Sequence, residues 1–270
     1  MPSFTNRTYR IARDGDSFIL RLPGSGTERY IDRAGEIANA QAAASLGIAP
    51  KIVFADPESG VMVTRFIEGA APLSPQRLKD KADLNGTVDL LHRLHESGLT
   101  FQGVMRLYPK MDEYLALAPA PELLPLRREV EPLRPILEPG WGPLRPCHID
   151  PAPQNFITAG SARYLVDWEY AAMCEPLWDL AGLSIEGEFD ADQDLAMLTQ
   201  YFGATAPRSM SRLHLYRLVL RLLAASWWAV QRADVGGGAP AAADMLRRLT
   251  AGIAADLAAG DLDRHIAAAR

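Results

Sequence analysis

The sequence has 270 residues, of which 48% are hydrophobic and 23% are charged. A chain of this length and composition can bury the core of one large domain or of two lobes that share a cleft, which excludes a peptide or a globally disordered protein. Lysine and arginine number 28 against 33 acidic residues, so the net charge is −5. This balance argues against a nucleic-acid partner, because binding to phosphate backbones requires clustered positive charge.

The number of cysteines and the hydropathy of the chain indicate the cellular compartment in which the protein is expected. Cys147 and Cys174 are too few for a disulfide scaffold and fit reduced thiols in a cytoplasmic protein. The first ten residues, MPSFTNRTYR, lack the apolar stretch of a signal peptide, and the most hydrophobic run, residues 213–230, is interrupted by Arg217 and Arg221. We therefore expect a cytoplasmic protein without membrane insertion.

The first third of the chain predicts a small β-sheet with one helix. A Pro-Gly-Ser-Gly sequence at 23–26 ends a β-prone run, and Gly47 is a typical C-cap after an Ala-rich helical pattern. The sequence DPESG separates two further apolar runs and is typical of a hairpin turn. The predicted elements are a strand at 18–22, a helix at 32–46 and a hairpin formed by 52–54 and 61–63.

The remainder predicts mostly helices with a short β interruption. Ser74 is a typical N-cap, and the apolar spacing after it continues to Gly98, which predicts one helix across this range. The many prolines between 119 and 146 favour connecting structure over regular elements. Beyond them we expect short strands at 144–147 and 164–167, then helices to the C-terminus with a break at the glycines 236–238.

Four polar residues at the β interruption form the pattern H-x-D-x-x-x-x-N, followed by an apolar strand that ends in Asp. They are His148, Asp150, Asn155 and Asp167. Phosphoryl transfer requires a carboxylate that orients the attacking hydroxyl and accepts its proton, together with oxygen ligands that hold Mg²⁺ against a triphosphate. Protein kinases use a D-x-x-x-x-N loop and a following Asp for this purpose. Alone, these residue types are also common in turns and caps.

The chain resembles the choline/ethanolamine kinase family, and especially its bacterial branch, within the aminoglycoside-phosphotransferase-like and protein-kinase-like group. The resemblance covers nearly the whole chain and is strongest in ILRLPGSGTERYIDRAGEIANA, DPESGVMVTRFIEG, CHIDPAPQNF and LVDWEYAAMCEPLWDLA. It implies a two-lobed α+β protein-kinase-like fold. A small N-terminal lobe of β-sheet and one helix, residues 1–68, would bind nucleotide, and a larger, mostly helical C-terminal lobe, residues 69–270, would carry the catalytic loop and substrate site.

The resemblance also implies a role for each residue of the motifs. Asp150 would be the catalytic base, and Asn155 and Asp167 would hold Mg²⁺ against ATP. Arg21 would contact the α- and β-phosphates of ATP, and Glu36 on the following helix would pair with Arg21. An Arg at this position keeps a permanent charge and a bidentate fork of donors.

Two further groups of residues would support the nucleotide and the catalytic loop. His148 would be a structural member of the loop, and Asp179 would steady it from the start of a helix. The adenine base would bind backbone groups of the hinge, which corresponds to Thr64, Arg65, Phe66 and Ile67.

Choline carries a quaternary ammonium group, which donates no N–H hydrogen bond and is held best by aromatic faces and carboxylates. The candidates are Glu169, Tyr170, Trp227 and Trp228, of which Tyr170 matches a choline-site tyrosine of the family. The two tryptophans are adjacent here, whereas the family often spaces them three apart, and Ala224 occupies the first place. Adjacent helical residues diverge by about 100°, so core packing is the alternative role for these tryptophans.

The N-terminus also departs from the family pattern. Family members carry a strand and paired glycines before a Thr-Asn pair, whereas here residues 1–6 begin inside that loop without the glycines. This departure predicts reduced coverage of the phosphates, weak ATP affinity or poor stability.

Two other clusters have simpler interpretations. His92 and His95 lie three residues apart, a spacing that a metal can use, but no third ligand lies near them in the sequence. Asp190, Asp192 and Asp194 resemble a calcium loop but lack its glycine and its glutamate, so negative charge at a helix start explains them better.

We therefore expect an ATP- and Mg²⁺-dependent kinase that phosphorylates the hydroxyl of choline or a similar small amino alcohol. Ethanolamine, thiamine or an aminoglycoside would use the same catalytic residues with a different cleft lining. A catalytically silent nucleotide-binding protein is the alternative from another class, motivated by the missing glycine loop. The presence together of Asp150, Asn155 and Asp167 argues against it.

Overall fold

The structure is a computed structural model that describes residues 5–138, 142–204, 207–233 and 239–270. The chain forms two compact units. The first comprises Met1–Val104, Leu144–Asp179 and Glu186–Phe189, and the second comprises Met105–Pro143, Leu180–Ile185 and Asp190–Arg270. The expected lobe boundary at residue 68 stays a prediction. The features expected at residues 1–4 and at the glycines 236–238 lie outside the described residues.

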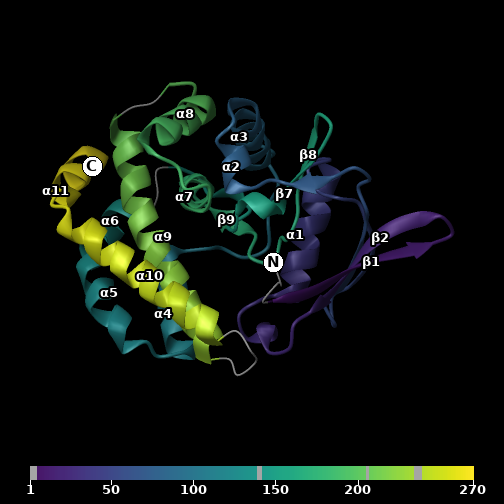
Figure 1. Cartoon of the computed structure of the whole chain (residues 1–270), viewed down its shortest axis with the longest axis horizontal. Coiled ribbons are helices and arrows are strands. Elements are labelled where there is room, and N and C mark those ends of the chain that lie inside the picture. The colour runs from purple at the N-terminus through teal and green to yellow at the C-terminus, as the bar shows by residue number, and fades with distance from the viewer. Residues whose placement is uncertain (1–4, 139–141, 205–206, 234–238) are drawn as a thin grey trace. The chain divides into compact units, whose positions relative to one another are not determined.

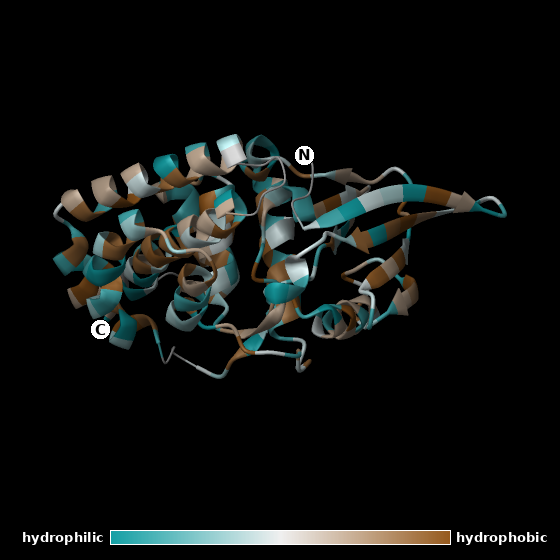
Figure 2. Cartoon of the chain, turned by 90° about the horizontal axis from the view of Figure 1, so that it is seen from below, coloured by the Kyte–Doolittle hydropathy of each residue, from teal (hydrophilic) through white to brown (hydrophobic). Residues whose placement is uncertain are grey.

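The first unit contains an antiparallel sheet of four strands: β1 (Asn6–Arg13), β2 (Asp16–Pro23), β3 (Ile52–Asp56) and β4 (Val61–Arg65). The strand order is β1-β2-β4-β3. Asp14 and Gly15 join the β1–β2 hairpin, purple in Figure 1, with φ values of 53° and 84°. An Asp-Gly turn of this kind matches the twist of the strands. β1 was not expected, because it is largely exposed and polar residues interrupt its apolar ones (Figure 2).

Helix α1 (Arg33–Ser45) follows β2 and confirms the helix predicted at 32–46. The Asp32 carboxylate caps it by accepting the N–H of Gly35 at 3.0 Å. Gly47 adopts the left-handed φ of 70° just beyond the helix, where a side chain would be strained. The helix therefore begins and ends where its own sequence signals place it.

The helix predicted between residues 74 and 98 is interrupted, so that prediction was wrong in its continuity. The structure has α2 (Pro75–Leu78) and α3 (Lys81–His95). Asp80 separates them, because its carboxylate accepts the N–H of Ala82 at 2.9 Å and caps α3. Asp competes for backbone donors in this way and favours a cap over a helix interior.

Five short strands complete the β structure: β5 (Ala71–Pro72), β6 (Arg145–Cys147), β7 (Phe156–Ala159), β8 (Ala162–Leu165) and β9 (Ala172–Cys174). β7 pairs with both β5 and β8, and β6 pairs with β9. The two short strands expected around the motif are present, but β8 ends two residues before Asp167. Asp167 lies outside the strand with φ of 69°, a left-handed conformation that Asp tolerates better than most residues.

The second unit is helical and contains α4 (Leu107–Leu117), α5 (Leu124–Val130), α6 (Arg134–Leu137), α8 (Ala191–Phe202), α9 (Pro207–Ala233), α10 (Ala239–Ala258) and α11 (Leu262–Ala269). α7 (Leu177–Glu186) contributes residues to both units. α9 packs against α4, α10 and α11, and it runs beside α10 in Figure 1. These elements confirm the expected small sheet with one helix and the mostly helical remainder.

Two features of the helices bear on the sequence interpretation. Asp190 and Gln193 form a reciprocal cap at the start of α8, with hydrogen bonds of 2.9 and 3.0 Å, which confirms the helix-start interpretation of this acidic cluster. None of the described helices has the length and apolarity that crossing a membrane requires.

The proline-rich segment was expected to be connecting structure, and this was wrong. It contains the short helices α5 and α6, together with 3₁₀ turns at Pro121–Leu123 and Glu131–Leu133. Each of these elements has a proline in its first two positions. A proline there does not disturb the helix, because the first turn has no internal acceptor for its missing N–H.

Buried Asn39 on α1 hydrogen-bonds to the backbone of two segments that are distant in the sequence. Its substitution is therefore expected to destabilise the fold strongly. Its amide group donates to the backbone oxygen of Ala171 at 2.7 Å and accepts the N–H of Gln102 at 2.7 Å. We expect Asn39→Ala to lower the free energy of unfolding by about 2–4 kcal/mol, because it leaves buried backbone groups without partners. Asn85→Ala on α3 should cost less than about 1 kcal/mol. Urea denaturation checks both variants, and equal losses would contradict the account.

Candidate functional site

The loop between β6 and β7 carries Asp150 and is fixed by a buried carboxylate. Asp179 accepts the backbone N–H groups of His148 and Ile149, each at 2.8 Å. Ile149 has φ of 74°, which is a strained conformation for a β-branched residue. Such a conformation persists only where its surroundings hold it, so Asp179 fixes the direction in which the loop presents Asp150.

His148 is a buried structural part of this loop. Its Nε2 atom lies 3.0 Å from the backbone oxygen of Val166, so Nε2 carries the proton of the ring. The ring packs edge-on against Trp168, with 4.8 Å between ring centroids. Burial lowers the pKa of His148, which keeps the ring neutral. These contacts join the loop to the segment that carries Asp167.

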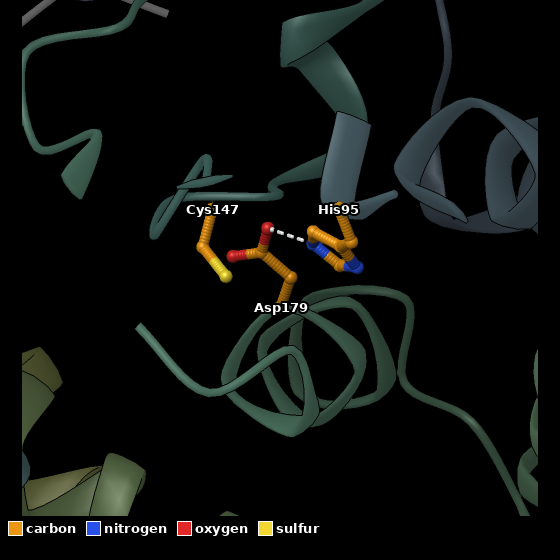
Figure 3. A group of neighbouring side chains, drawn as sticks. All are labelled: His95, Cys147 and Asp179. Carbon is orange, nitrogen blue, oxygen red and sulfur yellow. Dashed lines mark hydrogen bonds and ion pairs between the residues drawn. The ribbon is translucent and has the colours of Figure 1, made fainter. Parts of the chain in front are cut away.

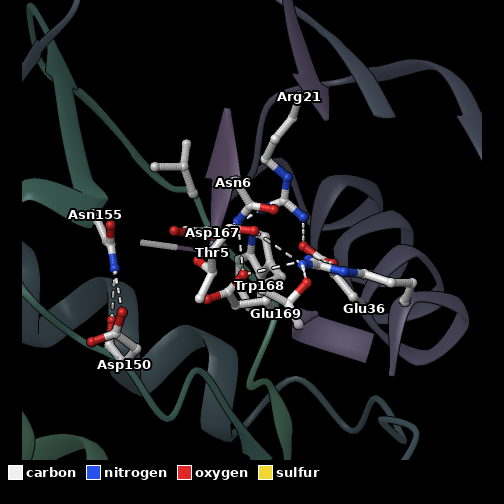
Figure 4. Close-up of polar contacts among 12 residues, drawn as sticks. Thr5, Asn6, Arg21, Glu36, Asp150, Asn155, Asp167, Trp168 and Glu169 are labelled. Atoms are coloured by element: carbon white, nitrogen blue, oxygen red, sulfur yellow. Dashed lines mark hydrogen bonds and ion pairs between the residues drawn. The ribbon is translucent and has the colours of Figure 1, made fainter. Parts of the chain in front are cut away.

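Asn155 lies at the end of the loop, in a 3₁₀ turn, and faces Asp150 (Figure 4). Its Nδ2 group donates to Oδ2 of Asp150 at 3.1 Å and to the backbone oxygen of Asp150 at 3.0 Å. Because both hydrogen bonds use the amide nitrogen, the carbonyl oxygen of Asn155 remains available as a ligand.

The environment of Asp150 favours its protonated form. Loss of hydration raises the pKa of Asp150, and the negative charges of Asp167, Glu186 and Glu169 raise it further, to about 8. The hydrogen bond from Asn155 acts in the opposite direction. Positive charge bound beside Asp167 would offset the repulsion and return Asp150 to the carboxylate form, which is the form that accepts a proton.

Asp167 belongs to a chain of ion pairs that links the sheet to α1. Nη1 of Arg21 lies 2.7 Å from Oδ1 of Asp167, and the same guanidinium pairs with Glu36 (Figure 4). Arg21 lies on β2 and Glu36 on α1, and both are buried. The permanent charge of Arg21 is therefore held beside Asp167 by a fixed partner.

Three further residues extend this network and were not expected as site residues. Arg33 pairs with Glu36 at 2.8 Å and with Glu169 at 3.4 Å, and it donates to the backbone oxygen of Thr5 at 3.2 Å. Asn6 donates to Glu169 at 2.7 Å. The spacing of Arg33 and Glu36 on a predicted helix was an available signal. Thr5 and Asn6 match the Thr-Asn pair of the family pattern, but their partners lie too far away in the chain for residue spacing to predict these contacts.

The residues expected to bind choline fall in both units. Glu169 is buried, and its pKa is raised to about 7 by loss of hydration and by the charge of Asp167. Tyr170 follows it and is half-buried. Trp227 and Trp228 lie on α9 in the second unit, with their rings in edge-to-face contact at 4.9 Å. Contact of these four residues with a substrate stays a prediction.

Glu186, at the end of α7, was not expected as a site residue. Its side chain is exposed, and its charge raises the pKa of Asp150. Loss of hydration and the charge of Glu188 raise the pKa of Glu186 as well. The sequence signal is its spacing, because Glu186 lies seven residues after Asp179 and therefore on the same face of α7.

One backbone N–H group of the hinge segment, residues 64–67, is available to donate a hydrogen bond to a nucleotide base. The N–H of Arg65 donates to the backbone oxygen of Lys51 at 2.8 Å, and that of Phe66 to Ser17 at 3.1 Å. The N–H of Ile67 has no acceptor among the described residues. Thr64 lies in β4. Binding of adenine by these four residues stays a prediction, with Ile67 as the expected donor.

Asn155 and Asp167 fit a magnesium ion. One is an amide oxygen and the other a carboxylate, and Mg²⁺ is bound in proteins by one or two such oxygens with waters and phosphates completing its shell. Asp167 uses Oδ1 for Arg21, and its other oxygen makes no hydrogen bond in the described part of the chain. The donor chemistry therefore suits the ion that the sequence predicts.

His92 and His95 do not form the shared metal site that their spacing in the sequence would allow. His95 is fully buried against Asp179, whereas His92 is exposed, so the two histidines do not share one environment. Cys147 and Cys174 are buried free thiols, as expected, and burial raises the pKa of Cys147 well above its usual value.

Residues 2–216 match the phosphotransferase enzyme family. A choline/ethanolamine kinase family protein from Mesorhizobium loti is 33% identical, with a TM-score of 0.82 over 100% of this chain and 91% of that chain. Choline kinase LicA from Streptococcus pneumoniae is 26% identical, with a TM-score of 0.81 over 94% of this chain and 92% of that chain. A structure of LicA in complex with AMP is also similar, with a TM-score of 0.78.

Two further proteins of similar sequence carry different names. Protein LicA of Haemophilus influenzae is 26% identical over 212 residues, which are 74% of this chain and 61% of that protein, so this chain spans less than two thirds of its length. Thiamine kinase of Shigella sonnei is 26% identical over 237 residues, which are 85% of this chain and 80% of that protein. Together the matches confirm the resemblance inferred from the motifs, and with it the kinase-like α+β fold.

The raised pKa of Asp150 predicts that stability depends on pH. An Asp in an unfolded chain titrates near pH 4, whereas this carboxyl group holds its proton to about pH 8. Between these values the native state binds more protons than the unfolded state, so stability falls as the pH rises. Asp150→Asn removes this loss, so we expect its Tm to exceed that of wild type by roughly 2–4 °C near pH 8.5 and by less near pH 5.

Thermal unfolding in EDTA, followed by circular dichroism at both pH values, measures this difference. Asp192→Asn, which neutralises an exposed carboxylate on α8, is the matched control and should show no such trend. A Tm difference for the Asp150 variant that stays constant with pH would contradict the predicted protonation.

Proposed function

Because this chain belongs to the phosphotransferase enzyme family, we propose that it is a small-molecule kinase that transfers the γ-phosphoryl group of ATP to the hydroxyl of choline or a similar amino alcohol. One observation carries the proposal. The loop that Asp179 fixes presents Asp150 and Asn155 together, near an Asp167 that is paired with the permanent cation Arg21. Phosphoryl transfer requires this set of an acceptor-orienting carboxylate, metal-binding oxygens and fixed positive charge.

In the proposed reaction the hydroxyl of the acceptor lies against Asp150. The carboxylate orients the hydroxyl oxygen in line with the γ-phosphorus and takes its proton, while the new O–P bond forms and the bond to the leaving ADP breaks. Mg²⁺ held by Asn155 and Asp167 would supply charge neutralisation at the phosphates. Because the transition state is loose, the position of Asp150 counts for more than its basicity.

The nucleotide would be held by groups from the sheet and its hinge. Arg21 would contact phosphate oxygens, and the 2.7 Å distance from its guanidinium to Asp167, a proposed Mg²⁺ ligand, supports this role. Ile67 would donate its N–H to the edge of the base. The likeness to a LicA structure that contains AMP supports nucleotide binding by this chain.

The negative charge around Asp150 favours a cationic acceptor. Glu186 and Glu169 both raise the pKa of Asp150, so both act on charge at the place where the acceptor hydroxyl would lie. A quaternary ammonium group would add positive charge there without needing a hydrogen-bond acceptor. Tyr170 would supply an aromatic face, together with the predicted Trp227 and Trp228.

Thiamine is the second candidate acceptor. It also carries a permanent positive charge and a primary hydroxyl, and a thiamine kinase is among the relatives. Ethanolamine or an aminoglycoside would present primary ammonium groups, which favour carboxylates over aromatic faces. The cytoplasmic location and the absence of nucleic-acid and membrane partners stay predictions.

A phosphorylation assay tests the proposal. With ATP and Mg²⁺, the purified protein should convert choline to phosphocholine faster than it phosphorylates ethanolamine, thiamine or an aminoglycoside, measured by ³¹P NMR and ADP release. Asp150→Asn should lower kcat by roughly 10²–10⁴-fold and leave KM for ATP within about threefold, because it removes the acceptor-orienting group alone. Asp192→Asn is the control and should match wild type. Near-normal turnover by the Asp150 variant would show that the base is misassigned.

Glu186 tests the recognition of positive charge. Glu186→Gln keeps the shape of the side chain and removes its charge, so KM for choline should rise by roughly 5–20-fold while KM for ATP stays unchanged. The neutral analogue in which a tert-butyl group replaces the trimethylammonium group should show no such change. Asp192→Asn, which removes the charge of an exposed carboxylate on α8, is the control and should leave both KM values unchanged. An equal rise for choline and its neutral analogue would assign Glu186 a steric role instead.

A further inference from the structure

A group of metal-ligating residue types lies in the helical second unit, where α11 packs against α9 (Figure 1). Its members are His214 of α9 and, at the start of α11, Asp261 and His265. One ligand atom of each residue lies within 4.8 Å of those of the other two. Asp261 and His265 are four residues apart, a spacing that places both on one face of α11. The kinase chemistry proposed above uses none of the three.

We propose that His214, Asp261 and His265 bind a divalent transition-metal ion that joins α11 to α9, and that Zn²⁺ fits this site best. Imidazole nitrogens and carboxylate oxygens are common ligands of Zn²⁺. Three protein ligands and one water complete its tetrahedral shell. The site lies outside the set of residues that would bind ATP and the acceptor, so the proposal goes beyond the proposed function.

The distance between two of these residues fits a shared ion better than a direct hydrogen bond. Nε2 of His265 lies 3.4 Å from Oδ2 of Asp261. A charge-assisted hydrogen bond is shorter, at about 2.7–2.9 Å. Two ligands that are each about 2.0–2.2 Å from a tetrahedral ion lie about 3.4 Å apart. The separation of these two atoms therefore matches one edge of a zinc tetrahedron.

The other oxygen of Asp261 is a second, independent indication of a ligand. Oδ1 of Asp261 is buried and accepts no hydrogen bond from the described residues, whereas Arg264 donates to Oδ2 at 3.5 Å. A buried carboxylate oxygen without a partner is costly. A metal ion, or a water bound to that ion, would supply the missing interaction. The side chains of His265 and Asp261 are 16% and 34% exposed, which leaves a path by which an ion can enter.

The histidine rings are held in the form that binds metals. Nδ1 of His265 lies 3.3 Å from Oγ of Ser211, a buried residue one turn before His214 on α9. With the proton on Nδ1 and donated to Ser211, Nε2 presents its lone pair, which is how metal-ligating histidines are commonly oriented. The rings of His214 and His265 stack with their centroids 4.0 Å apart, so two charged rings would repel each other. Burial and the charge of His265 lower the pKa of His214, which favours its neutral form.

The surroundings leave a negative charge for the ion to offset. Arg217 and Asp256 both act on His214, in opposite directions. Each is already paired, Arg217 with Asp194 and Asp256 with Arg221. With neutral histidines, the carboxylate of Asp261 therefore gives the three ligands a net charge of about −1, which suits a divalent cation.

A second cluster of metal-ligating residue types differs in this respect. His95, Cys147 and Asp179 are fully buried and lie together in the first unit and at the start of α7 (Figure 3). The oxygens of Asp179 accept hydrogen bonds from His95 and from two backbone N–H groups. That carboxylate is therefore already satisfied, whereas Asp261 retains a buried oxygen without a partner among the described residues.

Metal titrations of the purified protein test the proposal. The protein is first freed of metal with EDTA, and no nucleotide is added. Zn²⁺ binding is measured by calorimetry, and Co²⁺, a spectroscopic substitute for Zn²⁺, is followed by visible absorption. Every titration is repeated in Asp167→Asn, so that binding at the proposed Mg²⁺ site is counted separately. We expect saturable Zn²⁺ binding that Asp167→Asn retains, with the Co²⁺ bands of a four-coordinate site. Zn²⁺ should also slow hydrogen exchange in residues 255–270 and leave α1 unchanged.

Substitutions assign the ion to these residues. His214→Gln, His265→Gln and Asp261→Asn should each weaken Zn²⁺ binding by at least roughly 100-fold and remove the protection of α11. Ser211→Ala should weaken it by roughly tenfold, because Ser211 only orients a ligand. The matched controls are His92→Gln, at an exposed histidine, and Asp263→Asn, at an exposed position on α11, and both should bind Zn²⁺ as wild type does. Circular dichroism shows which variants fold, and each of the three ligands is tested separately.

Three outcomes would overturn the proposal. They are the absence of saturable Zn²⁺ binding by wild type, wild-type affinity in any folded variant of the three ligands, and a sulfur-to-cobalt charge-transfer band, which would assign the ion to a cysteine. Binding is read without ATP or an acceptor. Loss of the metal site would therefore leave the proposed kinase function standing, and a protein that phosphorylates no acceptor would leave the metal site standing.

Discussion

The site contains more carboxyl groups than arginine side chains, so its negative charge is only partly neutralised by the protein itself. Oxygens of Glu36, Asp167 and Glu169 lie within 4.8 Å of one another, and Arg21 and Arg33 pair with them. With the carboxyl group of Asp150 nearby, acidic groups outnumber these two guanidinium groups. Repulsion of this kind is costly at low hydration and is relieved by protons or by a bound cation. The raised pKa of Asp150 and the suitability of the site for Mg²⁺ follow from the same constraint.

The second requirement is that these groups stay in place despite their repulsion. The ion pairs from β2 and α1 hold Asp167, while the carboxylate of Asp179 holds the loop that presents Asp150. Both networks consist of buried, hydrogen-bonded charged groups. Removal of one partner from such a network strongly destabilises the fold, because the other partner is left buried without compensation. The left-handed backbone at Ile149 and at Asp167 shows that packing elsewhere in the fold stabilises unfavourable local geometry at the site. A reaction that depends mainly on positioning requires rigidity of this kind.

Local signals in the sequence predicted what depends on neighbouring residues, such as the helix capped by Asp32 and the spacing of the catalytic loop. They did not predict contacts that the tertiary fold creates. Asn6 meets Glu169 across 163 positions, and no periodicity could indicate that pair. β1 has two apolar side chains on one face, Tyr9 and Ile11, but both are exposed and arginines flank them. The cap at Asp80 divided a helix whose apolar spacing continues through it. In the proline-rich segment the prolines predicted a loop. They occupy first helical turns instead, where proline is compatible with a helix.

The central claim is that Asp167 and its neighbours bind a divalent cation with the nucleotide. Titration with Mn²⁺, a paramagnetic substitute for Mg²⁺, in the presence of a nonhydrolysable ATP analogue and with electron paramagnetic resonance as the readout, tests this claim most directly. We expect saturable Mn²⁺ binding by wild type and by Asp192→Asn, and at least roughly tenfold weaker binding by Asp167→Asn. Equal Mn²⁺ affinity of the Asp167 variant and wild type would contradict the account.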